Sequence, residues 1–265
     1  MPLVHPAFAS GSDSALTMWP SYVINLAENT VRMDNTARQL TAQRIPFERI
    51  DAVNGWALSE SEISLAYDAE VNRRRGKHPL LRPEIGCYLS HVTAWRRVAE
   101  GESAGGFIFE DDFLATEDLP DVLSRLSEDE RDWDMVKLFS FDQGPRTVTR
   151  RQLGPRHEVV VPFRVPSCTV GYGLTREASR HLVRRATPFF RPVDEDQKFF
   201  WETGLRVALV LPSPVLAGDQ QAVTRTIREE RRLLVKRGSM QAWHSLIYQF
   251  RYQALLHWHW MQKKT

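Results

Sequence analysis

Three consecutive carboxylates, Glu110, Asp111 and Asp112, follow the apolar run Phe107–Phe109. Adjacent carboxylates repel one another unless a cation neutralises them, and oxygen-only ligands suit hard cations such as Mg²⁺ or Mn²⁺. In α/β sheets, ligands bind beyond the carboxyl ends of strands, which is where this cluster falls. The residues alone leave two interpretations open: a metal centre that binds a diphosphate, or an acidic turn that begins the next helix.

A second acidic cluster, Asp194, Glu195 and Asp196, follows Pro192 at a predicted helix start. Capping and the helix dipole favour carboxylates at helix N-termini, so one interpretation of this cluster is purely structural. The other is a general base, Asp194 or Asp196, that accepts the proton of an attacking hydroxyl. Together, a metal cluster and a base are what sugar transfer by direct displacement requires.

The helix predicted from Pro83 to Glu100 carries a polar stripe beside its apolar one. Pro83 suits the first helical position and Gly101 the C-terminal cap. Spacings of four, three and four residues bring Glu84, Tyr88, His91 and Trp95 to one face. Ser90 and His91 point about 100° apart, so they form no hydrolase pair. His91 is either a satisfied buried side chain or a hydrogen-bonding group beside the site.

Composition and missing motifs exclude several classes of protein. The chain has neither a GxxxxGK[ST] loop nor a GxGxxG loop, which argues against P-loop kinases and nicotinamide enzymes. Its 42% hydrophobic and 26% charged residues are typical of a soluble globular protein. It has no apolar run of about 18 residues, so no bilayer span is predicted. Cys87 and Cys168 lack zinc-ligand spacing and predict buried, reduced thiols.

The order of predicted elements indicates an α/β fold. A strand at 22–26, a helix at 30–44 and a strand at 47–53 make a βαβ unit with parallel strands. Further strands are predicted at 134–139, 158–162, 167–174 and 206–211, and further helices at 59–71, 175–186 and 195–203. The Gly/Pro/Arg-rich stretch 143–157 predicts a loop that serves as a lid. We expect a flexible leader at 1–19, a catalytic domain at 20–218 and a helical tail at 219–265.

Several segments, in this order along the chain, resemble glycosyltransferase family 25, the lipooligosaccharide and lipopolysaccharide galactosyltransferase family. The resemblance covers about residues 20–215 and is carried by Tyr22–Leu26 with Arg32, Ile45–Gly55, Pro83–His91, Phe107–Asp112, Gly171–Leu174 and Pro192–Asp194. The block Glu84–His91 followed by Glu110–Asp112 is the most specific part.

The resemblance implies a GT-A-like nucleotide-sugar-binding sandwich, with a mostly parallel sheet flanked by helices. It implies inverting transfer from a UDP-sugar with Mn²⁺ or Mg²⁺ at Glu110 and Asp112, of which Asp112 is the favoured direct ligand. It implies that Asp194 or Asp196 is the base. Donor-binding or near-site positions are implied for Asn25, Leu26, Arg32, Asp51, Ala52, Glu84, His91 and Asp111.

The segment 219–265 is basic and aromatic. It holds nine Lys or Arg against three Asp or Glu, a net charge of +6 that leaves −4 on residues 1–218. Basic residues interleave with Trp243, Tyr248, Phe250, Tyr252, Trp258 and Trp260, as in helices that lie in a membrane interface. The alternatives are a nucleic-acid-binding helix and a dimer arm. The negative balance of residues 1–218 argues against nucleic acid, and oligomers remain open.

These observations predict an enzyme of the cytoplasm, associated peripherally with the inner membrane. It transfers galactose from UDP-galactose to a core sugar of a bacterial surface glycolipid and forms a β linkage. A UDP-glucose-dependent glucosyltransferase is the nearest alternative. Galactose and glucose differ in the orientation of one hydroxyl, and no motif in the sequence distinguishes the two. A non-catalytic family member acting as a binding module is the alternative from another class.

Overall fold

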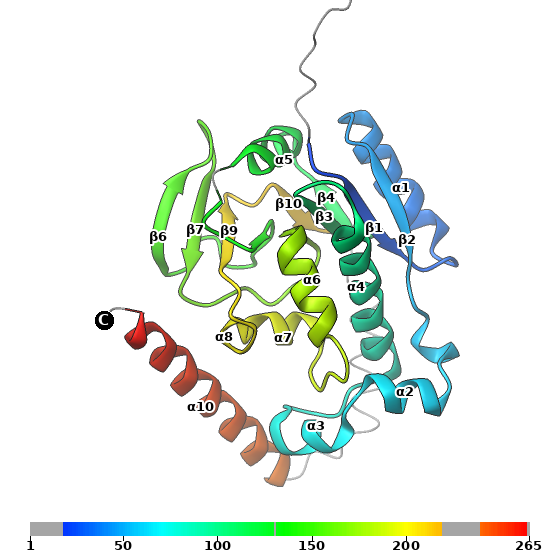
Figure 1. The fold of residues 1–265 in the computed structure, drawn as a ribbon, viewed down its shortest axis with the longest axis vertical. Helices are drawn as coiled ribbons and strands as arrows, with labels where there is room; N and C mark the ends of the chain where they lie inside the picture. The colour runs from blue at the N-terminus through cyan, green and yellow to red at the C-terminus, as the bar shows by residue number, and fades with distance from the viewer. Residues whose placement is uncertain (1–17, 130, 219–238, 264–265) are drawn as a thin grey trace, which may run out of the picture.

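The computed structural model describes residues 18–129, 131–218 and 239–263, and its centre is a sheet of eight strands (Figure 1). The strands lie in the order β2-β1-β3-β8-β5-β9-β7-β6. Their bounds are β1 Ser21–Asn25, β2 Phe47–Asp51, β3 Gly105–Glu110, β5 Met135–Lys137, β6 Thr147–Gln152, β7 Glu158–Pro162, β8 Gly171–Thr175 and β9 Val207–Leu211. Two short strands, β4 Phe113–Ala115 and β10 Val215–Ala217, pair beside it.

Six of the eight strands run in one direction. β1 is parallel to β2 and β3, and β5 is parallel to β9. β8 is antiparallel to both β3 and β5, and β7 is antiparallel to both β9 and β6, so only β7 and β8 are reversed within this sheet. The predicted α/β fold with a mostly parallel sheet is therefore confirmed, with two reversed strands inserted.

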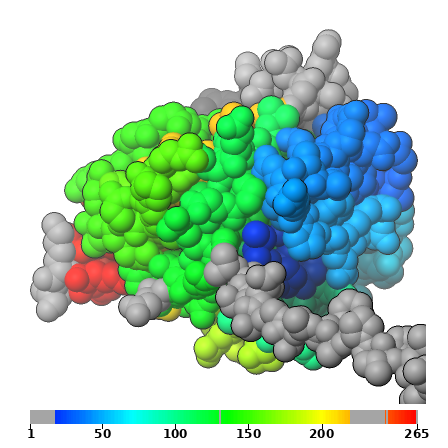
Figure 2. Space-filling view, turned by 90° about the horizontal axis from the view of Figure 1, so that it is seen from above, coloured from blue at the N-terminus to red at the C-terminus, as the bar shows by residue number. Residues whose placement is uncertain are grey.

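Helices cover both faces of the sheet because its strands are apolar on both sides. On β1, Tyr22 and Ile24 face one core and Val23 faces the other. The first core is covered by α4 (Arg82–Glu100), α6 (Arg176–Arg185) and α10 (Ser239–Gln262), and the second by α1 (Thr30–Ala42) and α5 (Leu119–Glu128). In Figure 2, the blue N-terminal residues and the green residues from the middle of the chain form opposite sides of one face.

Two predicted elements need correction. The helix expected at 59–71 is two helices, α2 (Glu60–Ala66) and α3 (Ala69–Arg75), because Tyr67 is extended and the Asp68 side chain accepts the Val71 amide to start α3. The 143–157 stretch is not a loop throughout, because it contains β6, which pairs with β7. The polar side chains of β6 lie at an exposed sheet edge, so the apolar pattern of a buried strand is missing.

The C-terminal helix α10 is part of the folded core. Tyr248, Tyr252, Leu256 and Trp260, each four residues apart, are buried in the first core. The predicted placement of Tyr248, Tyr252 and Trp260 in a membrane interface is therefore wrong. Seven of the nine basic residues of the tail, the six from Arg225 to Arg237 and Lys264, lie outside the described residues. No helix among the described residues is long and apolar enough to cross a membrane.

The start of the domain lies slightly earlier than predicted. Residues 1–17 of the predicted leader lie outside the described residues. Trp19 is buried against Phe107 and Trp133, and its amide donates to the Ser127 hydroxyl at 2.9 Å. Trp19 therefore belongs to the core rather than to a leader.

A short helix, α7 (Val193–Lys198), continues through Phe199 into α8 (Phe200–Thr203), and both lie between α6 and α10 (Figure 1). The prediction was a single helix at 195–203. The observed helix begins two residues earlier, at Val193, and is interrupted at Phe199. Asp194, Glu195 and Asp196 fall in the first turn of α7, where the helix dipole stabilises carboxylates.

Gly86 on α4 lies against the turn that follows β2. A Cβ at this position would stand 2.5 Å from the Val53 carbonyl oxygen and 2.6 Å from the Gly55 nitrogen, both backbone atoms that cannot rotate away. We expect Gly86→Ala to lower the free energy of unfolding by about 1–3 kcal/mol, measured by chemical denaturation. Gly144→Ala is the control, because nothing lies within 4 Å of its added Cβ. Equal stability of the two variants would contradict this packing argument.

Candidate active site

Glu110 ends β3, the strand beside β1, and its carboxylate is held from two elements. His91 Nε2 on α4 lies 3.2 Å from Glu110 Oε1, and the Thr169 hydroxyl donates to the same oxygen. Burial alone raises the pKa of Glu110, but these hydrogen bonds and the nearby charge of Lys137 outweigh it and lower the pKa. Glu110 therefore stays ionised at neutral pH.

His91 is fully buried and belongs to a chain of hydrogen bonds. The Tyr172 hydroxyl accepts the Trp95 indole N–H at 2.8 Å and lies 2.8 Å from His91 Nδ1. Because the phenol proton needs an acceptor, we infer that it is donated to Nδ1. The ring proton then lies on Nε2 and is donated to Glu110, so this chain fixes where the carboxylate points. The two interpretations of His91 thus coincide: it is buried and satisfied, and it contacts the acidic cluster.

Asp111 connects the acidic cluster to β1 and α1. Its Oδ2 accepts from the Asn25 amide at 2.6 Å, and its Oδ1 lies 3.4 Å from Arg32 Nη1. Its backbone carbonyl accepts from the Thr36 hydroxyl at 3.1 Å. Three of the residues implied for donor binding therefore lie in direct contact.

Asp112 has an unsatisfied carboxylate. Its Oδ1 is buried without a hydrogen-bond partner, and burial together with the charge of Glu110 raises the pKa of Asp112 to about 7. A divalent cation would neutralise this oxygen, and oxygen ligands suit Mg²⁺ or Mn²⁺. The donor set of Glu110 and Asp112 therefore fits the predicted ion.

Asp194 lies within electrostatic reach of this cluster. Burial raises the pKa of Asp194, and the charges of Glu195 and Glu110 raise it further, while Lys137 lowers it. The Glu195 backbone N–H donates to its carboxylate, which also lowers the pKa. Within the described residues no side chain is hydrogen-bonded to this carboxylate, so Asp194 is less engaged than its neighbour Asp196, and its pKa is higher than usual.

Asp196, the other candidate base, is already engaged elsewhere. Its Oδ1 accepts from buried Arg191 at 3.0 Å and its Oδ2 accepts from the Tyr88 hydroxyl at 2.9 Å. It lines a small cavity of about 130 Å³ with Trp95 and Phe189. Its contacts are those of a structural carboxylate, so the geometry favours Asp194 as the base.

The remaining predicted residues lie at the strand ends around the cluster. Leu26 is half-buried directly after β1, and the Ala52 amide donates to the Asn25 carbonyl at 3.0 Å. Asp51 ends β2 beside Asn25, with its side chain 86% exposed and paired with Arg49. Glu84 accepts from the Leu81 amide at 2.8 Å and so caps α4.

Cys87 belongs to this site, contrary to the prediction of a buried thiol. Its side chain is exposed, and its sulfur, a His91 ring nitrogen and a Glu110 oxygen lie within 4.8 Å of one another. Desolvation by the surrounding protein raises the pKa of the thiol, and nearby negative charges, those of Glu110, Asp194, Glu84 and Asp112, raise it further. The thiol therefore stays protonated at neutral pH. The spacing Glu84, Cys87, His91 on one helix face was the signal that could have found it.

Lys137 is a second residue that the sequence reasoning missed. It is fully buried at the end of β5 and donates to the Cys168 carbonyl at 2.6 Å and to Gln197 Oε1. Burial lowers the pKa of Lys137 to about 8, although Asp194 and Glu110 oppose this shift. It therefore joins α7, which carries Asp194, to the sheet. A lysine inside the apolar run Met135–Phe139 was the available signal.

We expect Lys137→Met to lower the free energy of unfolding at pH 7 by about 1–3 kcal/mol, because Gln197 and Cys168 lose their donor. The lowered pKa has a second consequence. Between pH 8 and 10.5 the unfolded chain binds more protons than the native one, so the stability of the wild-type protein rises with pH in this window. Denaturant titrations at pH 7, 8 and 9 should show this rise in the wild type and not in the variant. The exposed Arg97→Met is the control.

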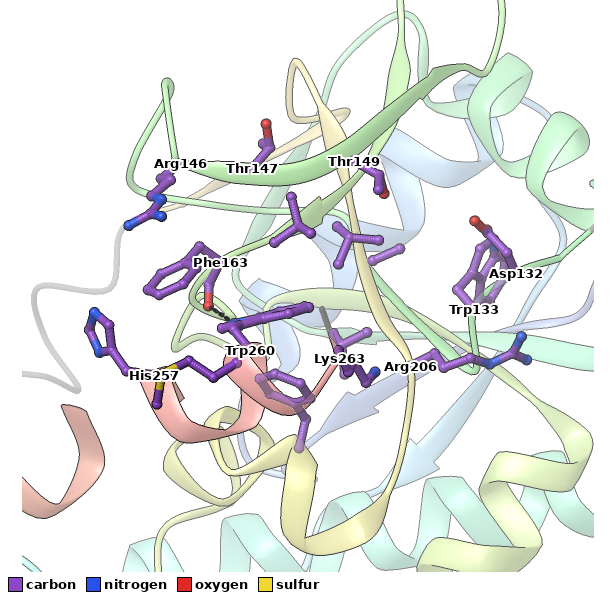
Figure 3. Close-up of a pocket in the computed structure, with 16 residues that line it drawn as sticks. Asp132, Trp133, Arg146, Thr147, Thr149, Phe163, Arg206, His257, Trp260 and Lys263 are labelled. Carbon is purple, nitrogen blue, oxygen red and sulfur yellow. Dashed lines mark hydrogen bonds between the residues drawn. The ribbon is translucent and has the colours of Figure 1, made fainter. Parts of the chain in front are cut away.

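A separate cavity of about 550 Å³ lies at the other edge of the sheet (Figure 3). It is lined by residues near the N-terminal ends of β5 and β9, among them Trp133 and Val207, and by Trp260 and Lys263 at the end of α10. β5 and β9 point the same way as β3, so this edge lies opposite the one that carries Glu110. None of the predicted site residues lines this cavity.

The acidic cluster lies at the carboxyl ends of the strands of a helix-covered, mostly parallel sheet, which is where α/β proteins generally bind their ligands. The sequence matches the model "Glycosyltransferase family 25 (LPS biosynthesis protein)" over residues 18–196. The chain therefore belongs to glycosyltransferase family 25.

Similar proteins include some that are named galactosyltransferases and one that is named inactive. Procollagen galactosyltransferase 2 of Mus musculus is 30% identical over 188 residues, 66% of this chain and 29% of the relative. Procollagen galactosyltransferase 1-A of Xenopus laevis is 29% identical over 187 residues, 66% and 30% of the two chains. Inactive glycosyltransferase 25 family member 3 of Homo sapiens is 30% identical over 190 residues, again 66% and 30%. The chain thus spans about three tenths of the length of these relatives.

Proposed function

We propose that the chain is a metal-dependent, inverting galactosyltransferase that uses UDP-galactose and glycosylates a core sugar of a lipopolysaccharide or lipooligosaccharide, forming a β linkage. The family model is described by lipopolysaccharide biosynthesis, and two of the similar proteins are named galactosyltransferases. The observation that carries the proposal is the buried, unpartnered Oδ1 of Asp112 beside ionised Glu110. Without a cation, this arrangement only costs stability.

The proposed reaction is a single displacement. Asp194 accepts the proton of the acceptor hydroxyl while that oxygen attacks the anomeric carbon from the face opposite UDP. The bond between the anomeric carbon and UDP breaks in the same step, so an α-linked donor gives a β-linked product. A divalent cation at Glu110 and Asp112 would supply charge compensation for the departing diphosphate.

Other residues of this chain bind and orient the donor in this proposal. Arg32, held by Asp111, offers positive charge near the diphosphate. Asn25 and Leu26 after β1, with Asp51 and Ala52 after β2, form the edge where the uridine would lie. The hydrogen bonds from His91 and Thr169 hold the Glu110 carboxylate in place, so it would be positioned for a cation before reaction.

Two alternatives remain distinguishable by experiment. UDP-glucose differs from UDP-galactose in the orientation of one hydroxyl, and the same site residues suit both donors. A non-catalytic role is the other, since a relative of 30% identity is named inactive. The carboxylate cluster favours activity, because a protein that binds no cation has no use for three costly adjacent acidic groups.

The test is UDP release by the purified protein from UDP-galactose and from UDP-glucose, with and without Mn²⁺. We expect slow hydrolysis of one donor that depends on the ion, followed by faster release when oligosaccharide acceptor is added. Loss of release in EDTA and its return with Mn²⁺ would support the metal site. If UDP is released from neither donor, and adding UDP and Mn²⁺ causes no thermal shift, the binding-module alternative is supported.

A further inference from the structure

Helix α10 is apolar on both of its faces. Its inner face, Tyr248, Tyr252, Leu256 and Trp260, is buried in the core. Six large apolar side chains at spacings of three, four and eight residues share the opposite side and are 58–77% exposed. This outer face consists of Trp243, Leu246, Ile247, Phe250, Trp258 and Met261. Such a contiguous exposed apolar stripe is characteristic of an interaction surface.

Among the described residues, exposed positive charge lies on α10 at Arg251 and directly after it at Lys263. The sequence of α10 contains no Asp or Glu, and from Arg231 to the C-terminus there are seven Lys or Arg and no acidic residue. At the end of the helix, Met261 and Lys263 line the cavity of Figure 3 together with Arg146. An exposed apolar face with Trp near both ends, on a helix without acidic residues and with exposed Arg251 and Lys263 on or beside it, complements an anionic lipid surface.

The inner face of the same helix contacts the proposed acceptor side of the site. The Tyr248 hydroxyl donates to Glu195 Oε2 at 2.7 Å, and the rings of Tyr248 and Tyr252 pack against Phe199. Glu195 adjoins Asp194 on α7. One helix therefore separates the candidate base from the exposed apolar stripe.

We propose that the outer face of α10 docks this protein on an anionic lipid surface and holds the Asp194 side of the site next to it. The docking itself does not depend on catalysis. Its use in bringing a lipid-linked acceptor to Asp194 rests on the function proposed above. A second copy of the chain is the competing occupant of this face.

The test is flotation of the full-length protein with vesicles of phosphatidylcholine alone or with 30% (about one lipid in three) phosphatidylglycerol. We expect binding to the anionic vesicles to be at least about tenfold stronger and to weaken in high salt. The double variant Phe250→Ser/Trp258→Ser should lose about tenfold or more of that binding, because it removes two large apolar contacts. Val31→Ser/Leu65→Ser, which changes equally exposed apolar residues on α1 and α2, should bind like the wild type.

Other outcomes overturn the proposal. Equal binding to both kinds of vesicle, or unchanged binding by Phe250→Ser/Trp258→Ser, would remove the outer face as a lipid-docking surface. A dimer in light scattering that this variant dissociates, with no vesicle binding, would assign the face to a second copy. Donor hydrolysis in vesicle-free buffer tests the proposed enzyme function separately from lipid docking. In that assay Phe250→Ser/Trp258→Ser should match the wild type, because no lipid is present.

Discussion

Asp112→Asn is expected to lower the rate of UDP release by about two to three orders of magnitude at saturating Mn²⁺. The variant keeps the shape of the side chain but removes the charge that the ion would share with Glu110. Its binding of Mn²⁺, followed by calorimetry or by the thermal shift on adding the ion, should weaken in parallel. Metal binding is a readout that does not depend on turnover.

Without a bound metal ion, the same variant should be as stable as the wild type or more stable. In the wild type, burial and Glu110 raise the pKa of Asp112 to about 7, which means that its ionised form is disfavoured in the native protein. An amide carries no such charge, so the midpoint of thermal unfolding in EDTA should stay the same or rise. Asp121→Asn, at an exposed carboxylate paired with Arg125, is the control for both measurements. Full activity of Asp112→Asn in excess Mn²⁺ would end the metal assignment.

Asp194→Asn is expected to reduce kcat by about 10²–10⁴-fold, the usual contribution of a positioned general base. The KM for the donor should stay near the wild-type value, because this residue belongs to the acceptor side. Asp196→Asn should instead act mainly on stability, since the carboxylate of Asp196 is bound by Arg191 and Tyr88. The reverse pattern would exchange the two roles.

The pH profile provides an independent check of the base. A base must be ionised to act, so the rate falls as the pH drops through the pKa of Asp194. Burial and then Glu195 raise that pKa, so the acid limb should lie above the pH at which an ordinary aspartate titrates. Glu195→Gln removes the neighbouring charge but can still accept from Tyr248, so it should move the limb to lower pH. An unmoved limb would mean that another group limits the rate.

The sequence predicted those parts of the fold that depend on local pattern. The βαβ unit from β1 to β2 and the long helix α4 follow from apolar periodicity and end signals within about 20 residues. The insertion of reversed β8 between β3 and β5 was beyond such reasoning, because strand order is decided by contacts between segments far apart in the chain. β6 was missed because its polar side chains lie at an exposed edge.

The same limit applies to the site: residues adjacent in sequence could be predicted, and residues brought together by packing could not. Glu110, Asp111 and Asp112 are adjacent in sequence, so their cluster could be identified directly. Asp194 and Asp196 could not be told apart, because two residues along a helix point in very different directions and only the position of Arg191 shows which one is engaged. Lys137 and Cys87 enter the site through packing between helices and sheet, and a single sequence gives only faint signals of such contacts.

The extent of sequence similarity differs from the extent of the cooperative folding unit. The family match ends at Asp196, inside the short helix α7, yet β9 lies between β5 and β7 and is hydrogen-bonded to both. A recombinant fragment of residues 18–196 would therefore lack an interior strand of the sheet, and would also leave Phe163 without Trp260 beside it. A fragment bounded by homology alone would leave β5 and β7 without the strand between them, so expression should retain the chain through α10.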